Sequence, residues 1–353
     1  MSSKKIKVFL AAFTNQTNAQ NLSCRALAKY LDKDKFQVYT LAIKHGNLPT
    51  LQLDGVVIFY CGFPVKLTGI LGFIWGFFHA DVVYLPRGNF INWQRFLTRI
   101  FKVETFKTVR NVIDDEALKT AMSQLIKPTK GDLKKAYNFV DRVYAMTPYM
   151  SEYNYKRWGL NSEKITLLPP TDFEMFSKSV RVRSKLHKLV FIGNDWKRKG
   201  INDFLALADL FPDLEFHVIG RGNQKEYAQS NLKNVFFHGL LTEDVLVRKI
   251  QTADLHILPS RSEGLPRVWL EALANGLPSV LFKGYGAEDF VHQGKTGYVV
   301  EKLTDAEEII SGILNQSISL KELSEACIED AKNYHPAKLT KQYERVIESL
   351  YVS

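Results

Sequence analysis

Short apolar runs alternate with segments of helical periodicity along the whole chain. The runs expected as strands are KVFLAAF, FQVYTLAI, VVIFYC, DVVYLP, TVRNVI and RVYAMT in the first half, and KLVFIG, EFHVIG, NVFFHG, LHILPS, PSVLF and GYVV in the second. Helical patterns lie between most of them, for example over 22–31, 204–210, 245–252 and 266–275. Strands that are apolar on both faces and alternate with helices are typical of parallel sheets covered on both sides. The pattern therefore predicts an α/β protein with two doubly wound, Rossmann-like domains.

The length and one irregular segment suggest where these domains begin and end. A chain of 353 residues is long for one ordinary core. The basic stretch KSVRVRSKLH, 178–187, has no periodicity and is expected to join the domains. We therefore expect an N-terminal domain over 1–183 and a C-terminal domain over 184–335. An amphipathic pattern follows Pro336 and predicts a final helix over 336–353.

The composition is that of a globular protein without covalent cross-links. Hydrophobic residues make up 46% and charged residues 24% of the chain, which excludes a disordered protein. The three cysteines show neither zinc-ligand spacing nor a disulfide framework, so a reducing cytosol fits best. The eight histidines form no metal-ligand pattern, so no metal site is expected. The longest apolar stretch, 67–80, is too short to cross a bilayer, and we favour a buried crossover helix over a membrane dock.

The net charge of +10 is unevenly distributed. Residues 1–185 carry a net charge of +14 and residues 186–353 a net charge of −4, which indicates an anionic partner for the first half. Part of the excess lies among aromatic residues in a cluster of six bases: Arg87, Arg95, Arg99, Lys102, Lys107 and Arg110. Within it, NWQRFLTRIF (92–101) fits either a helix on an anionic membrane surface or an ordinary amphipathic cover helix. No standard nucleic-acid-binding module is visible, so no nucleic-acid partner is expected.

Two glutamates with seven residues between them mark the second half. In SEGLPRVWLEALANG (262–276), Glu263 lies in a loop after the expected strand LHILPS, and Glu271 lies inside the following helix. The N-terminus of a helix binds anions through free N–H groups and its dipole, and Gly264 lets a ligand approach the backbone. A nucleotide sugar would place its diphosphate at the helix start, its ribose hydroxyls at Glu271 and its sugar at Glu263. The alternative is two solvated glutamates that bind no ligand.

The segment LPSRSEGLPRVWLEALANGLPSVLF (258–282) closely resembles the C-terminal motif of family 4 glycosyltransferases. These are retaining enzymes with the GT-B fold, and they carry a Glu-x7-Glu pair in this strand–loop–helix setting. The resemblance continues in FIGNDWKRKGINDFL (191–205), EFHVIGRGNQKEYAQ (215–229) and GYGAEDFVHQGKTGYVV (284–300). It implies two Rossmann-like domains facing a central cleft, with the C-terminal helix packing back on the N-terminal, acceptor-binding domain.

The resemblance also implies roles for individual residues. Glu271 would bind the donor ribose, Glu263 would contact the donor sugar, and Lys199 would bind the diphosphate and stabilise the leaving group. Backbone N–H groups of Gly264 and Leu265 would add to the diphosphate site. The full set expected to bind the donor comprises Gly193, Asn194, Arg198, Lys199, Gly220, Arg221, Gly264, Leu265, Pro266 and Glu271.

Two positions in the chemistry-bearing loops depart from the family pattern. Asn194 stands where the family usually has an arginine, and Arg198 or Lys197 could substitute for that phosphate contact. Asp114 stands where the family often has a histidine, after the expected strand TVRNVI. It either takes a catalytic position against sugar or acceptor, or it caps the next helix together with 115–116.

A third departure lies near the N-terminus. TNQTNAQN (14–21) replaces the glycine-rich loop of many relatives. It is expected to bind the acceptor through Asn15, Thr17 and Asn18, together with Arg87. The alternative is an ordinary polar loop that ends in a helix cap.

Together, these observations and the resemblance predict a retaining, nucleotide-sugar-dependent glycosyltransferase. The expected acceptor is a glycan or lipid-linked glycan in cell-surface polysaccharide or glycoconjugate biosynthesis. Neither a cofactor nor a metal ion is required, because Lys199, neighbouring bases and the helix N-terminus can neutralise the diphosphate. The expected location is the cytoplasm, with peripheral attachment to an anionic membrane face. The alternatives are a GT-B sugar-nucleotide epimerase or hydrolase, and a non-catalytic GT-B-like binding subunit.

Overall fold

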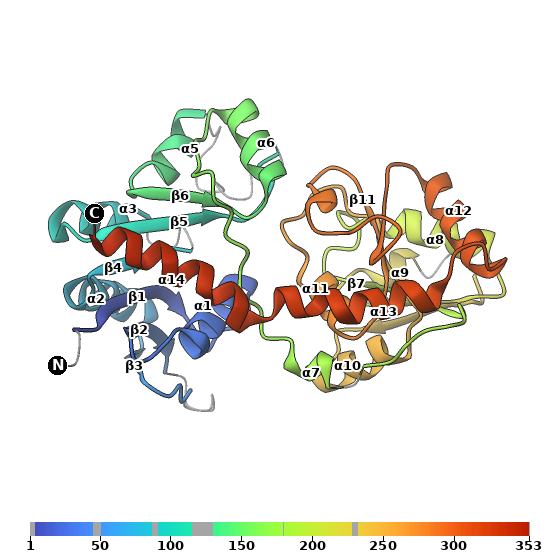
Figure 1. The fold of residues 1–353 in the computed structure, drawn as a ribbon, viewed down its shortest axis with the longest axis horizontal. Helices are drawn as coiled ribbons and strands as arrows, with labels where there is room; N and C mark the ends of the chain where they lie inside the picture. The colour runs from blue at the N-terminus through green and yellow to red at the C-terminus, as the bar shows by residue number, and fades with distance from the viewer. Residues whose placement is uncertain are drawn as a thin grey trace. The chain divides into compact units, whose positions relative to one another are not determined.

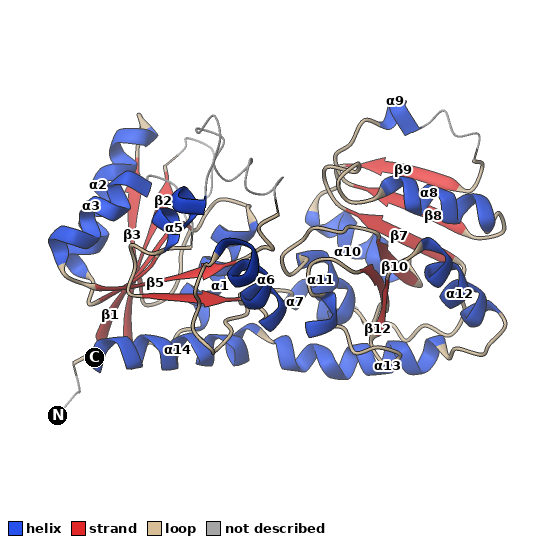
Figure 2. Ribbon diagram, turned by 90° about the horizontal axis from the view of Figure 1, so that it is seen from above, coloured by secondary structure: helices blue, strands red, loops and turns tan. Residues whose placement is uncertain are grey.

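The structure is a computed structural model that describes residues 4–44, 51–86, 91–114, 130–178, 180–227 and 232–352. The chain forms two compact units. The first comprises Met1–Asp172 and His335–Ser353, and the second comprises Phe173–Tyr334. In each unit helices lie around a central sheet (Figure 2).

The first unit is built on a six-stranded parallel sheet (Figure 1). Its strands are β1 (Ile6–Phe13), β2 (Phe36–Ile43), β3 (Val56–Cys61), β4 (Val82–Tyr84), β5 (Glu104–Val109) and β6 (Arg142–Ala145). Its described helices are α1 (Ala19–Tyr30), α2 (Val65–His79), α3 (Ile91–Phe101), α5 (Lys130–Tyr137), α6 (Pro148–Trp158) and α14 (Pro336–Val352). The strands pair in the order β3-β2-β1-β4-β5-β6.

The second unit repeats this plan. Its strands are β7 (Lys188–Ile192), β8 (Glu215–Ile219), β9 (Val235–Gly239), β10 (Leu255–Leu258), β11 (Ser279–Phe282) and β12 (Gly297–Val300). Its described helices are α7 (Glu174–Ser177), α8 (Ile201–Leu210), α9 (Gln224–Tyr227), α10 (Glu243–Thr252), α11 (Arg267–Ala274), α12 (Leu303–Leu314) and α13 (Leu320–Ala331), with short 3-10 turns η1 (Ala287–Asp289) and η2 (Lys332–Tyr334). The strand order is β12-β11-β10-β7-β8-β9, with parallel pairing throughout.

The two sheets share one topology, and it fixes where a ligand can bind. In each, the chain starts at a central strand, winds outward on one side, and then returns to wind outward on the other. The order reverses between β1 and β4 in the first unit and between β7 and β10 in the second. Ligands of open α/β sheets bind beyond the carboxyl ends of the strands at this switch point. The predicted fold of two doubly wound α/β units is therefore confirmed, and the loops after β7 and β10 are the place to look for chemistry.

The core of the first unit explains the position of the last helix. Tyr343, Val346, Ile347 and Leu350 of α14 are buried in one cluster with residues of α1, β1 and β4. The opposite face of the sheet packs Phe9 against Phe73 and Phe77 of α2. Helix α14 thus belongs to the first unit although it follows the second in sequence. Within the described part of the chain, we find no helix with the length and apolar character needed to cross a membrane.

One expected strand lies in the wrong place. TVRNVI was expected to form a strand over 108–113, but β5 covers Glu104–Val109. The residues after Val109 leave the sheet, because the N–H of Ile113 donates to Oδ1 of Asn154 at 2.9 Å instead of to a neighbouring strand. The apolar side chains of Val112 and Ile113 are nevertheless buried, which is why the pattern resembled a strand.

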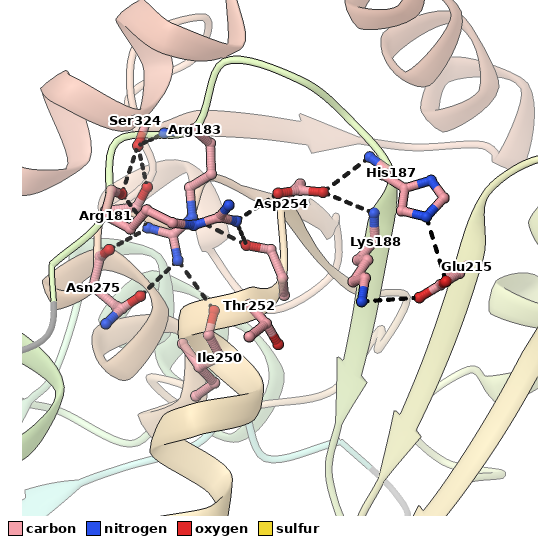
Figure 3. A network of polar contacts seen from close by, with 12 residues as sticks. Arg181, Arg183, His187, Lys188, Glu215, Ile250, Thr252, Asp254, Asn275 and Ser324 are labelled. Carbon is pink, nitrogen blue, oxygen red and sulfur yellow. Dashed lines mark hydrogen bonds and ion pairs between the residues drawn. The ribbon is translucent and has the colours of Figure 1, made fainter.

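The segment expected to join the domains packs inside the second unit instead (Figure 3). Arg183 is 1% exposed, and its guanidinium donates to the carbonyl oxygens of Ile250 and Ala253 at 3.1 Å each and to Oδ1 of Asn275 at 2.6 Å. These acceptors lie at or just after the ends of α10 and α11, where helix carbonyls lack partners. Arg181 forms an ion pair of 2.5 Å with Asp254. The basic residues therefore anchor this segment rather than make it a loose linker.

Candidate active site

The loop after β7 is held in a compact turn. Gly193 follows the strand, and its N–H donates to the carbonyl of Ile219 at the end of β8, at 2.9 Å. Trp196 is 2% exposed and covers Gly222 so closely that a Cβ atom on Gly222 would lie 2.0 Å from the indole. Helix α8 then begins at Ile201. The loop is fixed by packing at both ends, so its polar side chains have defined positions.

Lys199 extends directly across Gly193. A Cβ atom on Gly193 would lie 2.2 Å from Cδ and 2.6 Å from Cε of Lys199, far inside the contact distance of two carbon atoms. Because glycine has no side chain, the space over Gly193 is open and the side chain of Lys199 occupies it. The Nζ atom ends 2.7 Å from Oε1 of Glu263, and both side chains are largely buried, at 13% and 12% exposed.

One carboxylate oxygen of Glu263 accepts three hydrogen bonds. Besides Lys199, its Oε1 accepts hydrogen bonds from Oγ of Ser260 at 3.0 Å and from Nη1 of Arg198 at 3.3 Å. The same Nη1 donates to the carbonyl of Ser262 at 2.6 Å, and Nε of Arg198 pairs with Asp195 at 3.2 Å. The structure thus brings Lys199, Arg198 and Glu263 together in one charged cluster. Ser260 is a member that the sequence analysis missed, although its place two residues beyond β10 was a signal.

The second glutamate lies inside α11, as expected, and is not solvated. Its side chain is 6% exposed, and Oε1 lies 2.6 Å from Nε of Arg267, one helical turn earlier. Burial raises the pKa of Glu271, and the positive charge of Arg267 opposes that rise. Arg267 also pairs with Glu243 at 3.2 Å. Arg267 was not among the expected site residues, although an arginine four residues before a glutamate is the spacing of a helical ion pair.

The start of α11 differs by one residue from the expectation. Pro266 is the residue before the first helical one, with extended backbone, and the helix begins at Arg267. Gly264 and Leu265 lie in the bend between Glu263 and this helix. The first N–H groups of a helix have no acceptor within the helix, so the start of α11 offers donors just after this bend.

Asn194 links the two neighbouring loops of the sheet. Its Oδ1 accepts the N–H of Arg221 at 2.7 Å, and the N–H of Asp195 donates to the carbonyl of Arg221 at 3.2 Å. Gly220 has a φ of +120°, and a Cβ atom there would lie 2.1 Å from the carbonyl oxygen of Gly193. The residue that stands in place of the family's arginine therefore fastens the loop after β8 to the loop after β7.

Two buried residues lie beneath the charged cluster. His256 on β10 is fully buried, with Nδ1 3.0 Å from Oγ of Ser279, and burial together with the charge of Lys199 lowers the pKa of His256 to about 3. Tyr285 is also fully buried, and its hydroxyl has no hydrogen-bond partner among the described residues. Burial and the charges of Glu263 and Glu288 raise the pKa of Tyr285. Both side chains are neutral, so the charge of the site comes from the lysine, the arginine and the glutamates.

The candidate acceptor residues of the first unit mainly shape its backbone. Asn15 uses both ends of its amide on Ile43, donating to the carbonyl at 2.8 Å and accepting the N–H at 3.0 Å. Asn18 caps α1 by accepting the N–H of Asn21 at 3.1 Å, and Thr17 is exposed beside it. These contacts favour the alternative of a polar loop with a helix cap.

The remaining predicted residues lie at or beyond the limits of the described ranges. Asp114 is the last residue of the range 91–114 and belongs to the first unit. Arg87 and residues 115–116 lie outside the described residues. Across the ranges that the structure does describe, no group of three or more His, Cys, Asp or Glu side chains is arranged to hold a metal ion.

Comparison with known proteins finds glycosyltransferases. Residues 172–334, which coincide with the second unit, match the family model described as glycosyl transferases group 1. An uncharacterized glycosyltransferase of Haemophilus influenzae is 31% identical over 37% of this chain and 41% of its own length. N-acetyl-alpha-D-glucosaminyl L-malate synthase of Bacillus anthracis is 27% identical over 63% of this chain and 55% of its own length. The matches thus span about half the length of these relatives.

A solved structure matches almost the whole chain. HepE of Anabaena in complex with UDP and glucose superposes with a TM-score of 0.73 at 16% identity, covering 98% of this chain and 100% of that one. At this level of identity the likeness shows the fold, which is the two-unit GT-B fold.

Proposed function

Residues 172–334 form a domain of the glycosyl transferases group 1 family, and on that premise we propose that the chain transfers a sugar from a nucleoside-diphosphate donor to an acceptor hydroxyl, with retention of configuration. The observation that carries the proposal is the cluster of Lys199, Arg198 and Glu263 directly before the start of α11. Two bases, the start of a helix with its free N–H groups and a buried glutamate about one turn into that helix match the successive parts of a nucleotide sugar.

In this proposal the diphosphate binds to Lys199 and Arg198. Glu263 balances these two charges, and it keeps them directed at one point. A diphosphate brings its own negative charge, so it shares or displaces the carboxylate as a partner of Nζ. Glu263 is then free to turn toward the donor sugar. N–H groups of Gly264 and Leu265 supply further donors, and all of these are in place before the reaction starts.

Glu271 binds the two ribose hydroxyls in the same proposal. A carboxylate accepts hydrogen bonds from vicinal hydroxyls at both oxygens. Arg267 holds Oε1, which fixes the side chain and favours its charged form against the effect of burial. The contact is the same in the ground state and the transition state, so it contributes to donor affinity more than to rate.

Retention needs no nucleophile from the protein. The bond between the anomeric carbon and the diphosphate oxygen breaks, and the bond from the acceptor oxygen forms on the same face of the sugar. The acceptor proton passes to the departing diphosphate. Lys199 and Arg198 stabilise the negative charge that develops on the diphosphate, so the chemistry calls for neither a metal ion nor a cofactor.

The charge of the first unit bears on the acceptor and on the cellular location. We propose a glycan or lipid-linked glycan acceptor in the synthesis of cell-surface polysaccharide or glycoconjugate, at the inner face of the cytoplasmic membrane. Residues 1–172 of this unit hold 24 Lys and Arg against 13 Asp and Glu, a net charge of +11, which supports attachment to an anionic surface.

Two measurements test the reaction. Nucleoside-diphosphate sugars that bind the native protein raise the midpoint of its thermal unfolding, so a panel of donors identifies the one that is used. Proton NMR of the product then gives its anomeric configuration, which should equal that of the donor. Donor turnover at a rate independent of any acceptor would instead indicate an epimerase or hydrolase. Binding without turnover would indicate a binding subunit.

A further inference from the structure

Large apolar side chains gather on one exposed face of the first unit. They lie on α2, on α3 and just before α2, and they are Phe63 (93% exposed), Leu67 (57%), Leu71 (50%), Phe78 (73%), Trp93 (39%), Phe96 (52%) and Ile100 (54%). The two helices lie side by side (Figures 1 and 2). Exposed apolar residues are common singly, but a contiguous group marks a surface that binds something. We call these seven residues the α2–α3 face.

Helix α2 carries large apolar side chains on both sides: Phe73 and Phe77 pack against the sheet, and a second set faces outward. Its glycines face the sheet, where a Cβ atom on Gly76 would lie 2.4 Å from the ring of Phe9 and one on Gly72 would lie 3.0 Å from Leu41. Leu67, Leu71 and Phe78 face outward at helical spacing. A helix that only covers a sheet has polar or charged residues on its outer side. The outward set therefore has another role than the core of this unit.

Helix α3 extends the same face. Its inner side is short, with Gln94 and Leu97 buried. Trp93, Phe96 and Ile100 recur every three or four residues on its outer side, and the rings of Trp93 and Phe96 meet edge to face at 5.8 Å. Aromatic side chains of this kind are favoured at the boundary between lipid headgroups and acyl chains.

The charged side chains of these two helices are of one sign. Helices α2 and α3 contain three bases, Lys66, Arg95 and Arg99, and no acidic residue, and Lys102 follows directly. An apolar stripe bordered by bases is complementary to an anionic bilayer, which accepts the apolar side chains and attracts the bases. A second copy of this chain would bring the same bases against each other.

We infer that the α2–α3 face inserts into an anionic lipid bilayer. The inference deepens the proposed function, because it rests on the membrane setting proposed there and identifies the residues that make the contact. Leu67, Leu71, Phe96 and Ile100 enter the acyl boundary, and Arg95 and Arg99 bind headgroup phosphates. Each base near an anionic bilayer contributes about a fivefold gain in partitioning.

Co-sedimentation with vesicles tests this assignment. The full chain is incubated with vesicles of phosphatidylcholine alone and with vesicles containing about one-third phosphatidylglycerol, at low and at physiological salt. We expect sedimentation with the anionic vesicles and a reduction at higher salt, because screening acts within about 8 Å at physiological ionic strength. The double variants Leu67→Ser/Leu71→Ser and Phe96→Ser/Ile100→Ser should each partition at least tenfold less. The matched control is Leu240→Ser, which alters a side chain that is 64% exposed in the second unit, and it should sediment like the wild type.

Several results would overturn the inference. The wild type could fail to sediment with anionic vesicles, or both double variants could sediment as much as the wild type. A dimer seen by light scattering that both double variants dissociate, without vesicle binding, would assign the face to a second copy. Calorimetric titration of the nucleoside diphosphate into the same variants separates this outcome from the proposed reaction. The variants should keep wild-type donor affinity, because the substituted residues are exposed and belong to the first unit.

Discussion

Adding one methyl group at Gly193 should disable the site without disturbing the fold. The new Cβ of Gly193→Ala would lie 2.2 Å from Cδ of Lys199, where unbonded carbon atoms need about 3.5 Å, so the lysine must move by more than about 1 Å. Gly193 does not have a positive φ, and the clash involves a flexible side chain, so the backbone can accept alanine. The contact of 2.7 Å between Lys199 and Glu263 is then lost.

The size of the effect follows from the lost contact. A hydrogen bond to a charged group is worth about 1.5–3 kcal/mol, so the affinity for a nucleoside diphosphate should fall about tenfold to a hundredfold. Misplacing a reacting group by about 1 Å can cost about a hundredfold in rate, so turnover should fall by about that factor. Calorimetry measures the first quantity, and release of the nucleoside diphosphate from the donor measures the second.

A double-variant cycle decides whether Lys199 is the cause. The variants Gly193→Ala, Lys199→Ala and the double variant should lose similar affinity, because all three remove one contact and their effects do not add. Lys233→Ala is the control, since Lys233 is an exposed lysine of the same unit, before β9, that belongs to no part of the candidate site. Additive losses in the double variant, or an affinity of Gly193→Ala within threefold of wild type, would refute the proposed path of the lysine.

Three further changes test the packing around the site. Burial raises the pKa of Glu271, so the folded state holds that proton more tightly than the unfolded state. The stability that this confers is present below the unfolded pKa near 4.3 and is lost as the pH rises through the folded pKa. Glu271→Gln should remove this pH dependence in denaturant unfolding between pH 4 and 8. Asn194→Ala should lower the free energy of unfolding by about 0.5–1.5 kcal/mol and weaken nucleotide binding, because the N–H of Arg221 loses its acceptor. Arg183→Met should cost more than about 3 kcal/mol in urea unfolding, since several buried carbonyls lose their donor together.

The strands and their alternation with helices could be read from the sequence because burial on both faces leaves a continuous apolar signal. The predicted strand TVRNVI was wrong because the same apolar signal arises without a strand. Val112 and Ile113 are buried but lie outside β5, and the sequence pattern does not distinguish a buried loop residue from a buried strand residue. The segment around Arg183 resembled a linker because basic residues are usually exposed to solvent. Their acceptors are the carbonyl groups of α10 and the residues after α11, which are distant in sequence.

The candidate site shows the same limit. Glu263 and Glu271 stood out because their spacing within one strand–loop–helix unit is local, and Lys199 because its loop resembles the family's phosphate loop. The contribution of Gly193, Ser260 and Asn194 depends on how neighbouring loops pack against one another. The place of these residues just after strands marks them as candidates, but local sequence does not give the distances between neighbouring loops. The outward direction of the apolar residues of α2 was hidden as well, because a helix that is apolar on all sides does not reveal which side faces the sheet.

The central claim is that the second unit binds a nucleoside-diphosphate sugar through Glu271 and the charged cluster before α11. Calorimetric titration of a panel of such donors into the wild type and into Glu271→Ala tests it most directly. We predict that one donor binds with a stoichiometry of one, and that Glu271→Ala binds it at least tenfold more weakly. Failure of every donor to bind at millimolar concentration, or equal affinity in the variant, would contradict the claim.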